Sequence, residues 1–150
     1  MAMTNDHVIS TLNNLIETCK DGQKGFLEAA EATKNPELST LFQGYSRQRT
    51  QFIGELQAEV RRLGGDPEQS GSVAGALHRG WINLKAAITG KSEQAVINEA
   101  ERGEDAAVRN YEDARQTGLP PMIQSIVERQ YTQVKSAHDR IRALEQQRAA

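Results

Sequence analysis

Apolar residues recur at helical spacing along nearly the whole chain, and no clear alternation of apolar and polar positions appears. This pattern predicts four long helices, over residues 5–33, 36–63, 93–117 and 121–147, and a shorter helix over 73–89. Asn35-Pro36 and Ser92 are typical helix starts. The side-chain oxygen of Asn or Ser can accept hydrogen bonds from the first free backbone amides, and proline suits the first helical position. Gly64 and Gly118 are typical helix stops.

The lengths of the connections predict how the helices are arranged. Short turns join the first helix to the second and the third to the fourth, so each of these pairs should be antiparallel. The stretch 64–92 is long enough to cross the bundle lengthwise, so the third helix should run parallel to the second. We therefore expect an all-α, ferritin-like four-helix bundle with a short extra helix in the long crossover, folded as one domain over residues 1–150.

Composition agrees with a water-soluble globular protein. Hydrophobic residues make up 37% of the chain and charged residues 25%, and the net charge is −2. No apolar run is long enough for a membrane span, and the N-terminus does not resemble a secretory signal, so we expect a cytoplasmic protein without a membrane partner. Lys and Arg are scattered, which argues against a nucleic-acid surface. Cys19 is the only cysteine and lies on an inward face, which favours a buried, inert thiol over a catalytic one.

Three stretches together resemble a family of uncharacterised bacterial ferritin-like four-helix-bundle proteins, classed as a domain of unknown function. They are TLNNLIETCKDGQKGFLEAAE at 11–31, LGGDPEQSGSVAGALHRGW at 63–81 and ERGEDAAVRNYEDA at 101–114. The resemblance implies the fold and a bacterial, cytoplasmic source. It implies no established activity.

The candidate chemistry lies in the middle of the predicted bundle. Metal-binding members of this architecture use Glu-x-x-His pairs on two helices, and this chain contains none. Helical periodicity nevertheless points Glu101 and Glu104 inward, puts Arg49 near the apolar centre of its own helix, and puts His138 at the edge of the core. The predicted polar layer consists of Glu101, Glu104, His138 and Arg49, with Tyr45 and Gln48 beside them.

This layer has three interpretations. The first is a structural network in which Arg49 pairs with Glu104, while Tyr45 or His138 bonds Glu101. The second is a mononuclear or degenerate site for iron or manganese, with Glu101, Glu104 and His138 as ligands. The third is a solvated run of charge. We favour the network, because a permanent cation at Arg49 would repel a metal ion.

His78, Arg79 and Trp81 form a second candidate group, in the crossover. They could bind a small anion or a partner, with Trp81 as a platform. Trp81 also falls in the apolar stripe of its predicted helix, so the favoured interpretation is that it anchors the crossover to the bundle.

The sequence therefore favours a non-catalytic protein over an enzyme. We expect a structural or interaction protein without a cofactor, stress-associated by analogy of fold alone. The alternative is a carboxylate protein that binds iron or manganese. A homo-oligomer is compatible with the sequence, which does not identify a protein partner.

Overall fold

The computed structural model describes residues 4–67, 81 and 92–149. Within them the chain forms four α-helices and no strand. These are α1 (Asn5–Ala32), α2 (Pro36–Arg62), α5 (Glu93–Arg115) and α6 (Pro121–Ala149). All four end within two residues of the predicted boundaries. The short helix expected over 73–89 lies outside the described residues, except for Trp81, which is not helical.

Local side chains begin and end the helices as the sequence predicts. The Asn35 side chain accepts hydrogen bonds from the amides of Glu37 and Leu38, at 2.9 and 3.3 Å, and Pro36 takes the first helical position. The Ser92 hydroxyl accepts from the third amide of α5 at 3.2 Å. Gly118 has a φ of 81°, a backbone conformation that favours glycine, and it ends the turn after α5.

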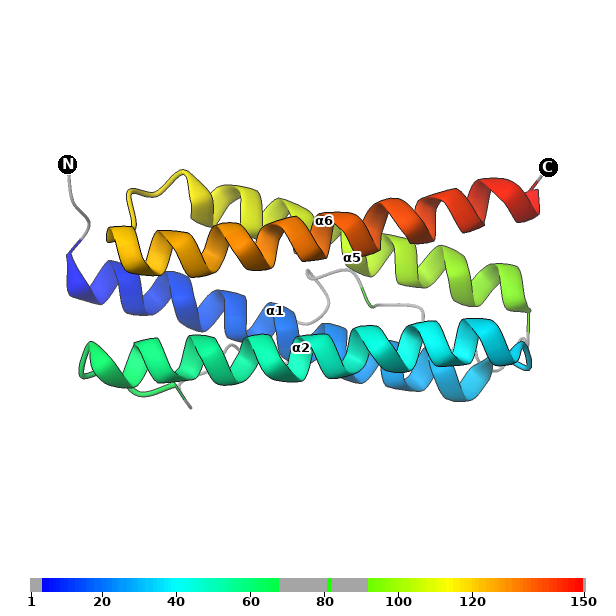
Figure 1. The fold of residues 1–150 in the computed structure, drawn as a ribbon, viewed down its shortest axis with the longest axis horizontal. Helices are drawn as coiled ribbons and strands as arrows, with labels where there is room; N and C mark the ends of the chain where they lie inside the picture. Colours follow the sequence, from blue (N-terminus) through cyan, green and yellow to red (C-terminus); the bar gives the residue numbers. More distant parts are fainter. Residues whose placement is uncertain (1–3, 68–80, 82–91, 150) are drawn as a thin grey trace.

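The helices are arranged with one lengthwise crossover, as predicted. Residues 33–35 join α1 to α2, and residues 116–120 join α5 to α6, so each pair is antiparallel. Figure 1 shows α5 running in the same direction as α2. Helix α1 packs against α2 and α5, and α6 packs against the same two helices, so α2 and α5 lie diagonally across the bundle.

Two apolar clusters fill the interior and meet at a polar layer. One cluster is centred on Leu12, Phe52 and Tyr111, and the other on Phe26, Phe42 and Ile97. Along α2, Arg49 separates the residues of one cluster from those of the other, and Glu104 does the same along α5. Both are buried. The core is therefore divided near its middle by charged side chains.

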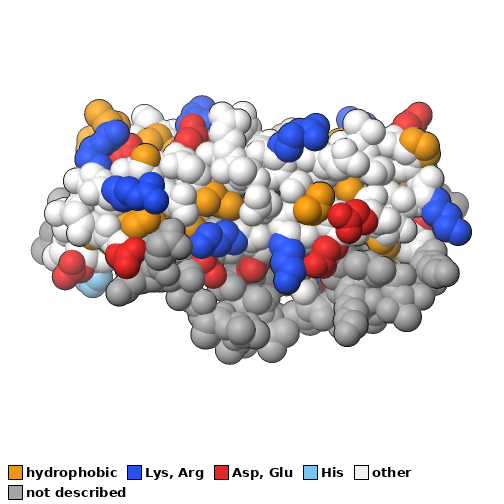
Figure 2. All heavy atoms as spheres, turned by 90° about the horizontal axis from the view of Figure 1, so that it is seen from below, with side chains coloured by type: hydrophobic (Ala, Val, Ile, Leu, Met, Phe, Trp, Pro, Cys, Tyr) orange, Lys and Arg blue, Asp and Glu red, His pale blue; other side chains and the backbone are white. Residues whose placement is uncertain are grey.

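The surface carries charges of both signs. Figure 2 shows Lys and Arg interspersed with Asp and Glu over the visible face, with scattered hydrophobic side chains between them. The exposed large hydrophobic residues among those described are Leu27 and Met122. No helix within the described ranges is both long and apolar enough to cross a membrane.

Trp81 packs into a slot made by two glycines on different helices. A Cβ added at Gly25 of α1 would lie 2.5 Å from Trp81 Cδ2, and one added at Gly103 of α5 would overlap the indole ring. The Phe26 ring meets the indole edge to face, with centroids 5.2 Å apart. The absence of a side chain at both glycines is therefore what lets Trp81 lie against the seam between α1 and α5.

The slot predicts a specific effect of Gly103→Ala. The added methyl group should displace Trp81, destabilise the fold by about 1–3 kcal/mol through overpacking, and shift the emission of this single tryptophan to longer wavelength. Urea unfolding and fluorescence measure both effects.

Gly54→Ala is the matched control, because a Cβ there meets nothing within 4 Å. It should leave the emission unchanged and stabilise the helix by about 0.5–1 kcal/mol. If Gly103→Ala behaved like this control, the packing of Trp81 between the glycines would be wrong.

Candidate functional site

A forked ion pair spans the interior of the bundle between diagonal helices. Arg49 of α2 donates from Nη1 and Nη2 to the two carboxylate oxygens of Glu104 on α5, and both distances are 2.6 Å. The side chains are 1% and 0% exposed. This geometry satisfies both oxygens of the acid with one planar cation, the strongest arrangement available to such a pair.

The surroundings of Arg49 are shaped to hold the guanidinium. A Cβ at Gly22 would lie 3.1 Å from Nη1, so the missing side chain lets the guanidinium approach the backbone of α1. The Phe26 ring centroid is 5.3 Å from Cζ, and Nε donates to Gln48 Oε1 at 3.2 Å. Burial disfavours the cation, but the Glu104 carboxylate outweighs it and raises the pKa of Arg49 further above its ordinary value.

A second buried network lies beside this pair and links all four helices. Tyr111 of α5 donates to Gln130 of α6 at 2.7 Å, and Gln130 donates to Glu55 of α2 at 2.9 Å. Cys19 of α1 lies 3.1 Å from the Tyr111 oxygen. Because the phenol gives its proton to Gln130, the thiol is the donor in this contact. Burial raises the pKa of Cys19 to about 11, which keeps the thiol protonated and unreactive.

Sequence reasoning missed Gln130, although a signal was present. Gln130 lies three residues after Val127 and four before Val134, so it occupies a core position of α6. A polar residue in an apolar stripe needs a buried partner. The partner, Tyr111, could not be identified without the register between α5 and α6.

A histidine and carboxylate cluster lies at the seam between α5 and α6. His138 Nε2 is 2.5 Å from Asp105 Oδ1 and 3.9 Å from Glu101 Oε1. On the other side of the ring, Nδ1 is 3.1 Å from Asp139 Oδ1. Among the described residues, Glu101, Asp105 and His138 each offer one ligand atom within 4.8 Å of the others, a spacing that could hold a metal ion.

The structure places the three predicted ligands, Glu101, Glu104 and His138, in two separate groups. Glu101 and His138 do come together, but Glu104 is held by Arg49, and Asp105 stands in its place. Successive helical residues differ by about 100°, so Glu104 points into the bundle while Asp105 points toward α6. Glu101 is half-buried, and its carboxylate lies 3.9 Å from His138 at the seam.

Three of the remaining predicted site residues lie among the described residues, and two do not. Gln48 joins the polar layer through Arg49, whereas Tyr45 contributes its ring, which packs on Phe26 at a centroid distance of 5.3 Å. Trp81 lies in the glycine slot. His78 and Arg79 lie outside the described residues.

The charges of the cluster act on one another. Burial raises the pKa of Glu101, and the negative charges of Asp105 and Glu145 raise it further. Burial opposes protonation of His138, but hydrogen bonds with Asp139 and Asp105 outweigh burial and raise its pKa above the ordinary 6.5. The contacts of His138 with Asp105 therefore link α6 to α5, and they favour the protonated imidazole over the neutral one.

Comparison with known proteins identifies the family. The family described as domain of unknown function DUF2383 matches residues 7–117, which is most of the chain. The chain belongs to this family. No curated protein matches it.

The fold of this DUF2383 protein is similar to that of a ferritin-like domain. The similar structure is the crystal structure of a two-domain protein containing DJ-1/ThiJ/PfpI-like and ferritin-like domains from Anabaena variabilis ATCC 29413. The TM-score is 0.78 at 16% sequence identity, and the match covers 99% of this chain and 38% of that chain. This chain thus spans well under half of the Anabaena chain, and the likeness shows the fold alone. The all-α, ferritin-like prediction is confirmed.

The buried ion pair between Arg49 and Glu104 predicts that single substitutions destabilise this DUF2383 protein strongly and that a double substitution does so less. Glu104→Gln and Arg49→Met each leave a buried charge without its counter-charge, so each should lower the free energy of unfolding by about 3–5 kcal/mol. The double variant Arg49→Met/Glu104→Met should recover much of this loss, because neither charge remains. Urea unfolding of the three variants measures these effects.

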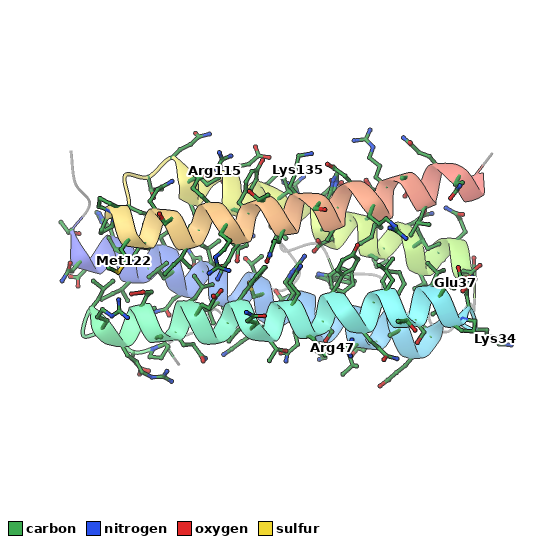
Figure 3. The ribbon with its side chains drawn as sticks, viewed as in Figure 1. Lys34, Glu37, Arg47, Arg115, Met122 and Lys135 are labelled. Carbon is green, nitrogen blue, oxygen red and sulfur yellow. The ribbon has the colours of Figure 1, made fainter. Side chains whose placement is uncertain are left out.

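Arg47→Met is the control for this series. Figure 3 shows Arg47 on the outer side of α2, and its substitution should change the stability by less than about 0.5 kcal/mol. Equal stability of Glu104→Gln and wild type would contradict the buried fork.

The raised pKa of His138 predicts a pH dependence of stability. A folded-state pKa above the unfolded value of about 6.5 gives stability that is complete below that value and lost as the pH rises through the folded value. The free energy of unfolding should therefore contain a component that falls as the pH rises above about 6.5 and through the folded-state pKa of His138. His138→Gln should remove this component, and the exposed His7→Gln should retain it. An unchanged slope in His138→Gln would refute the role of Asp105 and Asp139 in holding the imidazolium.

Proposed function

We propose that this protein is a non-catalytic ferritin-like bundle that serves as a structural or interaction module of the bacterial cytoplasm. The observation that carries the proposal is the buried fork between Arg49 and Glu104. In this interpretation, the ion pair occupies the middle of the bundle in place of a metal centre. The protein then works through its rigid shape and surface.

The donor set in the interior supports this proposal. A carboxylate-bridged metal pair needs several acidic ligands and two Glu-x-x-His pairs. This sequence contains no Glu-x-x-His pair. Both oxygens of Glu104 accept from a guanidinium that keeps its charge at every accessible pH. A metal ion brought to Glu104 would have to displace Arg49, and the displaced cation would remain in the low-dielectric interior.

The Anabaena structure offers an analogy for a module. Its chain carries a ferritin-like domain together with a DJ-1/ThiJ/PfpI-like domain. Such a bundle can therefore accompany another protein unit, and we propose that the present chain acts with a protein partner or with further copies of itself. Association with stress conditions is part of the same analogy of fold.

Metal content tests the proposal against its rival, an iron or manganese protein that uses Glu101, Glu104 and His138. Wild type and Glu104→Gln are purified without chelators, checked for helical content by circular dichroism, and assayed for iron and manganese per chain. The proposal predicts equal content in the two proteins. It also predicts that ferrous iron in air is oxidised no faster with wild type than with Arg47→Met or without protein.

Stoichiometric iron or manganese in wild type that is lost from folded Glu104→Gln would overturn the proposal. Accelerated oxidation of ferrous iron that Glu104→Gln abolishes would also overturn it. Either result would establish the metal-binding alternative, because each depends on the carboxylate that the fork otherwise occupies.

A further inference from the structure

The seam between α5 and α6 has the ingredients of a metal site that is separate from the interior ion pair. Glu101 and Asp105 are four residues apart on α5, so their carboxylates lie on one helix face, and His138 reaches them from α6. His138 Nε2 is 2.5 Å from Asp105 Oδ1 and 3.9 Å from Glu101 Oε1. All three ligand atoms lie within 4.8 Å of one another.

The donor types select a class of ion. One imidazole nitrogen with two carboxylate oxygens suits a divalent first-row transition metal, because calcium and magnesium prefer oxygen ligands alone. Zinc is commonly held by three protein ligands of these types, with a fourth position left to water. The half-buried carboxylate of Asp105 gives such an ion a path from solvent, since 43% of its side chain is accessible.

A second and independent observation is that His138 is oriented for coordination. Its side chain is 7% exposed, and Nδ1 lies 3.1 Å from Asp139 Oδ1. Lys135 in turn holds both oxygens of Asp139, at 2.9 and 3.1 Å. A carboxylate behind one imidazole nitrogen keeps the proton there and directs the lone pair of the other nitrogen toward an ion. Figure 3 shows Lys135 on the outer side of α6.

The electrostatics of the seam also favour a cation. Glu145 adds a further negative charge beside Glu101 and Asp105. A dication at Nε2 would replace the direct contact between His138 and Asp105. It would link α5 to α6 from the outside and leave the fork between Arg49 and Glu104 intact.

We propose that Glu101, Asp105 and His138 form a binding site for one divalent transition-metal ion, with Asp139 as the residue that orients the histidine. The site goes beyond the proposed structural function and does not depend on it. Its ligands face the α5–α6 seam, whereas Glu104 faces the interior.

Zinc binding to the full chain tests the site. Isothermal titration calorimetry with zinc chloride at pH 7.5 should give one ion per wild-type chain, and zinc should raise the melting temperature. His138→Gln and Asp105→Asn should each weaken binding at least tenfold, and Asp139→Asn should weaken it about 10–100-fold. Exposed positions on α1 and α5 provide the controls His7→Gln and Asp113→Asn, which should bind as wild type does.

The zinc affinities of the variants distinguish binding at the α5–α6 seam from binding at Glu104 in the interior. Glu104→Gln should keep its zinc affinity if it is folded, even if its stability falls. Absence of stoichiometric zinc binding would overturn the site, and so would equal affinities in wild type, His138→Gln and Asp105→Asn. Loss of zinc in Glu104→Gln with retention in His138→Gln would overturn it in favour of the interior. Asp105→Asn keeps the test decisive if His138→Gln fails to fold, because Asp105 is only half-buried and the substitution keeps its size.

Discussion

The burial of one ion pair constrains the rest of this bundle. Removing Arg49 and Glu104 from water is costly, and the cost is offset only when the two planar groups meet with both hydrogen bonds formed. These residues come from helices that lie diagonally across the core, so their contact fixes the height of α2 relative to α5. It also favours a glycine at position 22, where a Cβ would lie 3.1 Å from Nη1 of the guanidinium. The two apolar clusters therefore pack on either side of this ion pair.

The hydrogen bonds next to the fork extend the same constraint to the other helices. Cys19, Tyr111, Gln130 and Glu55 each belong to a different helix, and the chain of contacts between them has one productive register. A sliding helix would leave several buried polar groups without partners, each at a cost of about 1–3 kcal/mol. Apolar contacts alone discriminate less well between neighbouring registers. The polar centre therefore favours one arrangement of the bundle over shifted ones.

Helix α5 divides neighbouring acids between two environments. Glu104 faces the dry interior and neutralises a permanent cation, whereas Asp105 faces the seam with α6 and contacts a histidine that can gain or lose a proton. One residue of sequence, and about 100° of rotation, separates a structural carboxylate from one suited to binding chemistry. This division explains how a ferritin-like bundle can have a closed centre and still offer ligands at its side.

The sequence alone determined the four long helices, their caps, the parallel direction of α2 and α5, and the inward positions of Arg49 and Glu104. These features depend on short-range periodicity and on residues next to each helix end, which act within a few positions along the chain. Only the tertiary structure decided that His138 meets Asp105, that Gln130 meets Tyr111, and that Trp81 lies between two glycines. In each case the partner comes from another element. An error of one residue in register or rotation exchanges it for a different side chain.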